Sequence, residues 1–575
     1  MHLPTALSIA TLFCSAATAG QEPSEAPAPA PAPRIVEARE ARDGAELDAA
    51  IAALVRAHPD RIAARTLARS AGDRPIPLLT VGDDPANAAR RPAILVVAGM
   101  DGHRWSSTEA ALGIAEALLR DRPEALNGVL VHVLPRANPD PAEAFARTVR
   151  RAYSGNAVPH DNDKDGAGEE DPPRDLDGNG VITQMRKAGD FPPWSAPSMA
   201  TDPAEPRLMR APDAAAGQLP EWTVWTEGID ADGDGRMAED WAGGIDPERN
   251  FPHRWPEFED EAGVYPLLAP ESKAIADFVI ANPGIFAAVI IGRHDTVVSL
   301  PDAKAKTTHG MPVMIAEQDA GAYHALAKDL RERLGLSRAE GADTSGSLVA
   351  WLNAQRGMPA FATTLWGRPD VPAPADGAPA RTATPASAEE AAWLDYSDRV
   401  RGGRGFVPWT RHPHPQLFEV EVGGWVPGFR ENPPVEEVMA LADKCAGFLP
   451  ELAARRARVS LRTPTVTAVG PGLWRIDTAI ANSGRLPTVM QGGRAAGVVP
   501  AHVVRVSVPV TRIKAGRRMD VVRGIDPGTL RPVSWVVQAE PGEEVTVELL
   551  FAGQPEQRFS FRDGEPVPAA TEATP

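Results

Sequence analysis

A run of apolar residues at 94–98 ends in a polar loop, Gly99-Met-Asp-Gly-His-Arg104, and a helical pattern follows it at 105–119. This order predicts a strand, a loop and a helix. Because loops at strand ends carry the functional side chains of many α/β enzymes, the residues in this loop bear directly on what the protein does.

The alternation of strands and helices extends over residues 35–457. Strand-like runs occupy residues 76–81, 94–98 and 129–134, and helical runs occupy residues 271–280, 323–334 and 435–449. Continuous apolar strands between helices are typical of a sheet that is covered on both faces. We therefore expect an α/β domain over residues 35–457, with a mixed sheet flanked by helices.

A different pattern begins at residue 458. Short segments of alternating apolar and polar residues are separated there by Gly, Pro and Asn. This spacing predicts a small all-β sandwich over residues 458–562. The tail at 563–575 is rich in Pro, Ala and Glu and is expected to be disordered.

The first residues have the composition of a secretory signal. Residues 1–19 are mostly small or apolar and end in Ala17-Thr-Ala19, and a Pro/Ala-rich linker occupies residues 20–34. We expect a signal peptide, an extended linker and a secreted or periplasmic protein. If the signal is removed, Cys445 is the one cysteine left, so no intrachain disulfide can form.

Charge and hydropathy exclude several classes of partner. The formal net charge of −18 argues against nucleic acid and anionic membrane surfaces. No run after the signal is long and apolar enough to span a bilayer. The sequence carries no indication of the oligomeric state.

Three acidic loops lie in a segment at about 155–243. Each places acids or an Asn at alternate positions before glycine, and the candidate ligands are Asp161, Asp163, Asp165, Asp175, Asp177, Asn179, Asp230, Asp232 and Asp234. Calcium prefers several hard oxygen ligands, so we expect a structural calcium ion in at least one loop. The second loop is no regular EF-hand, because Arg186 stands where the bidentate Glu belongs. The alternative is a solvated acidic face.

Several motifs between residues 57 and 449 follow one another in a recognisable order. They are Ala57-His-Pro-Asp60, Arg91-Pro-Ala-Ile-Leu-Val-Val-Ala-Gly99, Leu134-Pro-Arg-Ala-Asn-Pro-Asp140, Gly244-Ile-Asp-Pro-Glu-Arg-Asn-Phe-Pro-His-Arg-Trp255 and Gly357-Met-Pro-Ala-Phe-Ala-Thr-Thr-Leu-Trp366. This order resembles the zinc carboxypeptidase family of the carboxypeptidase A type. It is especially similar to bacterial members with Asp-rich insertions and a β-sandwich behind the catalytic domain.

The resemblance implies a metallopeptidase fold and a defined set of site residues. In that family a His-x-x-Glu loop and a later His bind zinc, a late Glu is the general base, and an Asn-Arg pair holds the substrate carboxylate. The metal acidifies a bound water while the Glu accepts its proton. An arginine suits the substrate carboxylate because its planar fork can donate two parallel hydrogen bonds.

This chain departs from the family at most of those positions. Asp101 takes the place of the first His and Arg104 that of the zinc-binding Glu, with His103 as a possible substitute ligand. The later ligand falls at His294, although Gly292 is the other possible alignment. Thr364 takes the place of the general base, and a threonine cannot serve as a base near neutral pH. An arginine beside the metal would repel it.

The substrate clamp is altered as well. Arg249 is retained, whereas Glu248 replaces the Asn and would oppose an incoming carboxylate. Arg249 could equally pair with Glu248 or Asp246 and simply hold its loop.

Three functions remain open on these residues. The first is a secreted carboxypeptidase-like protein whose catalysis is lost and whose cleft binds peptide or cell-wall fragments. The second is an active metallocarboxypeptidase with a metal site rebuilt from Asp101, His103, His294 or Asp295. The third is a secreted protein that binds a partner through its β-sandwich. Calcium is expected with all three, and zinc only with the second.

Overall fold

The computed structural model describes residues 33–88, 91–147, 149–159, 168, 170–189, 196–238, 244–339, 341–371, 387–498, 502–551 and 554–568. Residues 35–575 form one compact unit, separate from residues 1–34. The predicted signal peptide, most of the linker and residues 569–575 of the predicted tail lie outside the described residues. In the part of the chain that is described, no helix combines the length and hydropathy needed to cross a bilayer.

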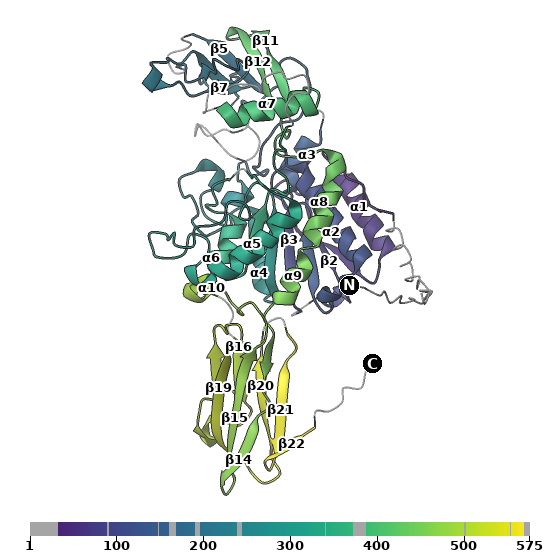
Figure 1. The fold of residues 1–575 in the computed structure, drawn as a ribbon, viewed down its shortest axis with the longest axis vertical. Helices are drawn as coiled ribbons and strands as arrows, with labels where there is room; N and C mark the ends of the chain where they lie inside the picture. The colour runs from purple at the N-terminus through teal and green to yellow at the C-terminus, as the bar shows by residue number, and fades with distance from the viewer. Residues whose placement is uncertain are drawn as a thin grey trace, which may run out of the picture. The chain divides into compact units, whose positions relative to one another are not determined.

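A six-stranded sheet forms the centre of the α/β domain (Figure 1). Its order is β1 (Ile62–Arg69), β2 (Pro75–Val81), β4 (Leu130–Leu134), β3 (Ala93–Ala98), β9 (Ile285–Ile291) and β10 (Ala360–Thr363). The pairs among β4, β3, β9 and β10 are parallel, whereas β1–β2 and β2–β4 are antiparallel. The sheet is therefore mixed, as predicted from the sequence.

Helices flank this sheet and bury it. They are α1 (Gly44–Ala57), α2 (Trp105–Asp121), α3 (Pro139–Phe145), α4 (Pro270–Ala281), α5 (Ala320–Leu334), α6 (Leu348–Ala354), α8 (Val435–Ala446) and α9 (Leu449–Arg455). All six residues of β3 are buried, because this strand has a neighbour on each edge and helices over both faces. The expected helix at 435–449 is interrupted: α8 ends before Gly447 and α9 begins at Leu449, with Pro450 in its first turn.

His132 on β4 is a buried titratable side chain within this core. Its Nδ1 lies 3.0 Å from the Thr80 hydroxyl, and its ring meets the Phe278 ring edge to face at 5.1 Å. Burial, with a smaller contribution from Arg65, lowers its pKa to about 4. The native state therefore keeps His132 neutral well below the pH at which the unfolded chain takes up a proton.

A pH-dependent cost follows from this shift. As the pH falls from 6.5 to 4, the unfolded state binds a proton at this position and the native state does not, so the wild type loses stability. The His132→Gln variant lacks this linkage. Over that interval we expect the wild type to lose about 1–3 kcal/mol more unfolding free energy than the variant, so that the difference between them narrows, as measured by urea denaturation. A difference that stays constant with pH would contradict the prediction.

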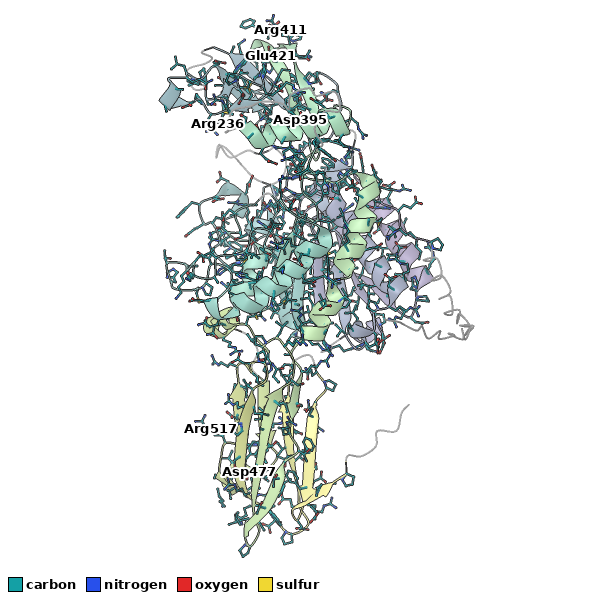
Figure 2. The ribbon with its side chains drawn as sticks, viewed as in Figure 1. Arg236, Asp395, Arg411, Glu421, Asp477 and Arg517 are labelled. Carbon is teal, nitrogen blue, oxygen red and sulfur yellow. The ribbon has the colours of Figure 1, made fainter. Side chains whose placement is uncertain are left out.

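A second sheet carries part of the acidic segment. Its antiparallel order is β11 (Phe406–His414), β12 (Phe418–Trp425), β5 (Gln184–Ala188) and β8 (Trp222–Thr226), and Glu421 of β12, labelled in Figure 2, pairs with Arg186 of β5 at 2.7 Å. The segment predicted at 155–243 is thus joined by two later strands. The remaining elements nearby are β6 (Ala200–Thr201), β7 (Met209–Arg210) and α7 (Ala388–Val400).

Two antiparallel sheets form the C-terminal region, as predicted. One contains β13 (Val459–Leu461), β14 (Thr465–Gly470), β15 (Leu473–Asn482), β17 (Ile513–Ala515) and β19 (Leu530–Gln538). The other contains β16 (His502–Val506), β18 (Met519–Val522), β20 (Glu544–Leu550), β21 (Gln557–Arg562) and β22 (Glu565–Val567). Their inner faces share one apolar core that includes Ile476, Trp535 and Val547, so the two sheets form a sandwich.

This region also contains a short helix, and its last strand lies within the predicted tail. The short helix α10 (Gln491–Ala496) lies between β15 and β16 in the chain. The prediction of disorder from residue 563 is wrong for β22, because this strand pairs with β21 and its backbone groups gain partners there.

Candidate functional site

The loop that follows β3 is held close to the first turn of α3. A Cβ at Gly102 would lie 2.3 Å from the backbone C and O of Pro141, so a residue with a side chain cannot occupy this position without moving the loop. This close approach fixes the backbone on both sides of Asp101. The Asp101 side chain is held in a buried position, with 2% of its surface exposed.

Asp101 is surrounded by cations. Its Oδ1 lies 2.9 Å from Arg293 Nη1 and accepts a hydrogen bond from the Ser154 hydroxyl at 2.6 Å. Its Oδ2 lies 3.9 Å from Arg104 Nε. Burial alone would raise the pKa of Asp101, but the guanidinium groups of Arg293 and Arg104 outweigh burial and hold the pKa well below its ordinary value. Asp101 is therefore an ionised partner of arginine.

Arg293 also holds a second buried carboxylate. Its Nη2 lies 2.5 Å from Asp246 Oδ2, and the other oxygen of Asp246 accepts the backbone N–H of Glu248 at 2.9 Å. Burial raises the pKa of Asp246 to about 6, in spite of the attraction of Arg293. Only 18% of the Arg293 side chain is exposed. One arginine thus bridges two buried acids from separate parts of the chain.

His294 faces Glu248. Its Nε2 lies 3.5 Å from Glu248 Oε2, and both side chains are 2% exposed. The same Glu248 oxygen accepts the backbone N–H of Leu348 at the start of α6, at 3.1 Å. In the described part of the chain neither ring nitrogen of His294 has a hydrogen-bond partner, and neither does Glu248 Oε1. The predicted ligand His294 and the predicted clamp residue Glu248 are therefore neighbours.

The other predicted residues of the zinc locus and substrate clamp have separate partners. Arg249 pairs with Glu259, so the alternative in which it pairs with Glu248 or Asp246 is wrong. The Thr364 hydroxyl donates to the Trp366 carbonyl at 2.9 Å.

Of the two remaining candidates of a rebuilt metal site, Asp295 is engaged elsewhere, whereas His103 interacts electrostatically with Asp101. His103 Nδ1 lies 3.4 Å from the Tyr153 carbonyl, and burial lowers the pKa of His103. Asp295 accepts backbone N–H groups of residues 297–299, which holds the turn after β9.

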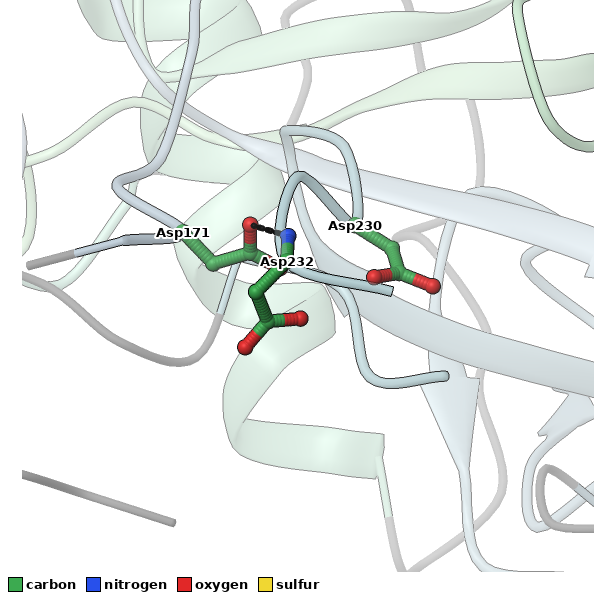
Figure 3. A group of neighbouring side chains, drawn as sticks. All are labelled: Asp171, Asp230 and Asp232. Atoms are coloured by element: carbon green, nitrogen blue, oxygen red, sulfur yellow. Dashed lines mark hydrogen bonds between the residues drawn. The ribbon is translucent and has the colours of Figure 1, made fainter. Parts of the chain in front are cut away.

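Two groups of acids lie in the predicted calcium loops. Asp171 lies near Asp230 and Asp232, and Asp175 and Asp177 lie near Glu227, with ligand oxygens within 4.8 Å of one another in each group. Figure 3 shows the first group, in which Asp171 accepts the backbone N–H of Asp232 at 3.2 Å. Burial raises the pKa of both Asp171 and Glu227. Each group could supply several oxygens to a hard cation.

The loops match the predicted ligands only in part. Asp234 lies 3.6 Å from Arg236 and joins neither group, and Asn179 donates a hydrogen bond to Asp177. Asp161, Asp163 and Asp165 lie outside the described residues. Glu227 was missed, because it follows β8 and no local spacing connects it to Asp175; it accepts the backbone N–H groups of Leu176 and Thr183, which bring it to the loop.

Two family models match parts of the chain. Residues 47–177 match the family model described as "Zinc carboxypeptidase". This part of the α/β domain is zinc carboxypeptidase-like. Residues 458–554 match a second model, described as "Domain of unknown function (DUF8731)". No curated relative matches the chain. The resemblance predicted from the sequence is thus confirmed by the segment that includes the β3 loop.

Solved structures of carboxypeptidases are similar to the chain at low identity. Bovine thrombin-activatable fibrinolysis inhibitor, in complex with tick carboxypeptidase inhibitor, is 14% identical over 56% of this chain and 85% of its own, with a TM-score of 0.34. Carboxypeptidase A from Helicoverpa armigera is 14% identical over 63% and 73%, also with a TM-score of 0.34. A metallo-carboxypeptidase from Burkholderia cenocepacia is 12% identical over 71% and 69%, with a TM-score of 0.31.

The residues at the zinc locus of the carboxypeptidase-like domain do not fit zinc. A zinc site needs three protein ligands of the His, Cys, Asp or Glu type converging on one point. Among the described residues, the two groups of three such ligands are those of the acidic loops, and neither includes Asp101, His103 or His294. Asp101 instead contacts two guanidinium groups. No catalytic step through zinc can be built on this arrangement.

Proposed function

We propose that the carboxypeptidase-like domain binds peptide or cell-wall fragments without hydrolysing them. The observation that carries this proposal is Arg293, whose guanidinium lies 2.9 Å from Asp101 and 2.5 Å from Asp246. A fixed cation there balances the charge that a metal would otherwise balance. The proposed location, secreted or periplasmic, rests on the composition of residues 1–19.

Electrostatics support the loss of the metal. Two unit charges 4 Å apart interact by about 4 kcal/mol at an effective dielectric constant of 20, and a divalent ion doubles this figure. Zinc placed beside Asp101 would be repelled by Arg293 and Arg104 together, while the attraction of Asp101 is already shared between them. The general-base position supports the same conclusion. A threonine hydroxyl is too weakly basic to accept a proton from water, and that of Thr364 donates a hydrogen bond to the Trp366 carbonyl.

Metal content and turnover test this function together. After exhaustive dialysis the full chain is expected to hold far less than one zinc per molecule by mass spectrometry, and to leave a library of peptides with free C-termini intact. An active zinc carboxypeptidase, dialysed and assayed in parallel, is the positive control. One zinc per chain together with release of C-terminal residues would instead favour the metallocarboxypeptidase with a rebuilt site.

We also propose that the acidic loops bind calcium as a structural ion. The support is the position of Asp171, which is 1% exposed and whose Oδ2 has no hydrogen-bond partner within the described ranges. A buried carboxylate oxygen without a donor is costly, and a cation would remove that cost. Asp171, Asp230 and Asp232, drawn in Figure 3, each have a carboxylate oxygen within 4.8 Å of the others, so Asp230 and Asp232 can supply further ligands.

Calcium is expected to stabilise the protein through these acids. At a free concentration one hundred times the dissociation constant, a bound ion adds about 2.7 kcal/mol to the free energy of unfolding. We expect the Tm to rise when calcium is added to the chelated protein, and the rise to be smaller in Asp230→Asn. Asp477→Asn in the β-sandwich, labelled in Figure 2, is the control and should keep the full rise. Equal rises in all three proteins would contradict the assignment.

A further inference from the structure

A cavity of about 380 Å³ lies beside the altered zinc locus. Arg104, from the β3 loop, and Thr364, which follows β10, both line it, so it occupies the region where the two substituted positions meet. Three more arginines and two glutamates share its wall, namely Arg338, Arg368, Arg430, Glu389 and Glu431. The ionisable side chains of the wall are therefore mainly positive, whereas the chain as a whole has a net charge of −18.

Two of these arginines, Arg104 and Arg430, have no hydrogen bond to a carboxylate among the described residues, although Arg430 also lies over the Trp425 ring at 4.9 Å. Arg368 is engaged, because it donates two hydrogen bonds to Glu389 at 2.8 and 3.0 Å. Arg104 and Arg430 have carboxylate oxygens only at 3.9 and 3.8 Å, beyond hydrogen-bond length. The Nε of Arg104 is buried and has no hydrogen-bond partner in the part of the chain that is described. A buried donor without an acceptor is costly. The Nε faces Asp101, and because Arg104 also lines the cavity, its guanidinium can donate to an oxyanion held there.

The rest of the wall is aromatic. Trp366 and Trp393 line the cavity with their ring centroids 5.6 Å apart, and they are 8% and 3% exposed. The indole N–H of Trp393 likewise lacks a hydrogen-bond acceptor among the described residues. The cavity therefore combines unbonded donors with two ring surfaces, which suits a ligand that has both an anionic and an apolar part.

A larger cavity adjoins this one. It measures about 670 Å³, shares Arg430 and Glu431 with the first, and is lined by the aromatic residues Phe406, Trp409 and Trp425. Because both cavities have Arg430 and Glu431 in their walls, a ligand anchored beside Arg104 could extend past Arg430 along these rings. Glu431 opposes an anion at the junction, so a single negative group is favoured over several.

We propose that this cavity binds an organic anion, with the oxyanion between Arg104 and Arg430 and the apolar body against Trp366 and Trp393. The inference rests on the proposed binding function and names its ligand class. The oxyanion is a carboxylate or a phosphate, since guanidinium groups bind both by the same paired hydrogen bonds.

Calorimetric titration with simple probes tests the ligand class. Benzoate and phenyl phosphate represent the two oxyanions, and benzyl alcohol is the neutral control. We expect saturable binding of at least one anion at one molecule per chain, weakened about tenfold or more by Arg104→Gln and by Arg430→Gln. Glu431→Gln should tighten binding. Arg517→Gln, an exposed arginine of the β-sandwich labelled in Figure 2, should leave it unchanged.

The controls keep this result separate from folding and from catalysis. Thermal melts report whether each variant folds, and Arg104→Lys, which keeps the charge, should bind more tightly than Arg104→Gln. The ratio of benzoate to phenyl phosphate affinity identifies the oxyanion. Absence of saturable binding of both anions, equal binding of benzyl alcohol, or equal affinity in all variants would overturn the inference. Zinc content and peptide turnover are measured on the same preparation, so that failure of the non-hydrolytic function is seen independently of anion binding.

Discussion

Replacement of Arg293 by Met is expected to lower the free energy of unfolding at neutral pH by about 3–5 kcal/mol. The substitution removes the cation that contacts Asp101 and Asp246, which are 2% exposed each. Asp246 then lacks its charge partner, and Asp101 keeps only the more distant Arg104, at 3.9 Å, of its two arginine partners. A carboxylate in this position must either remain charged in a poorly solvated site or take up a proton. Both outcomes destabilise the native state at pH 7.

Urea denaturation at two pH values checks this prediction. The pKa of Asp246 is already raised to about 6 beside Arg293, and it rises further in the variant, so protonation at about pH 5 should remove part of the loss. Arg254→Met is the matched control, because Arg254 forms a single, more exposed pair with Asp343 at 3.6 Å and should cost less than about 1 kcal/mol. If both variants lose the same small amount, Arg293 does not hold this centre together.

Gly346→Ala is expected to cost about 3 kcal/mol or more. The residue has a φ of +70° and sits against the backbone of Arg249, whose O lies 2.2 Å from the position that a Cβ would take. The left-handed conformation contributes about 1–2 kcal/mol for a residue with a Cβ, and the clash with a backbone that cannot move freely adds to it. The same residue exchanges backbone hydrogen bonds with Phe251 and His253, so its displacement would shift the segment that carries Asp246 and Glu248.

Gly310→Ala separates the two causes. Gly310 has a φ of +78°, but a Cβ there would meet no atom within 4 Å, so its substitution measures the conformational cost alone. We expect the Gly346 variant to lose clearly more stability than the Gly310 variant in parallel denaturation curves. Equal losses would mean that the backbone near Arg249 yields without cost.

The central sheet was predictable because its signal is local. The runs at 76–81, 94–98 and 129–134 are mostly apolar, and they form the largely buried strands β2, β3 and β4. The strand β11 was not predicted, because Pro408 and Pro413 within it argue against a strand. It stands at the edge of its sheet, where one side of the backbone needs no donor and proline is tolerated.

The sequence could indicate which chain positions belong to the candidate site, but not the contacts that their side chains make. The resemblance drew attention to Asp101, Arg104 and Thr364, and the structure brings Arg104 and Thr364 to the wall of one cavity. The role of Arg293 could not be foreseen, because its partner Asp101 lies 192 residues earlier and only the pairing of β3 with β9 brings the two together. Glu227 escaped notice for the same reason, since its neighbours come from a distant turn.

The bridge between Asp101 and Asp246 has a consequence for how the protein matures. The guanidinium is part of the polypeptide, so the cation that pairs with these two carboxylates is in place as soon as the chain has folded. On the function proposed above, it needs no loading step, no supply of zinc and no protection from zinc chelators. A protein built in this way should reach the same final state in zinc-starved cells as in zinc-replete ones.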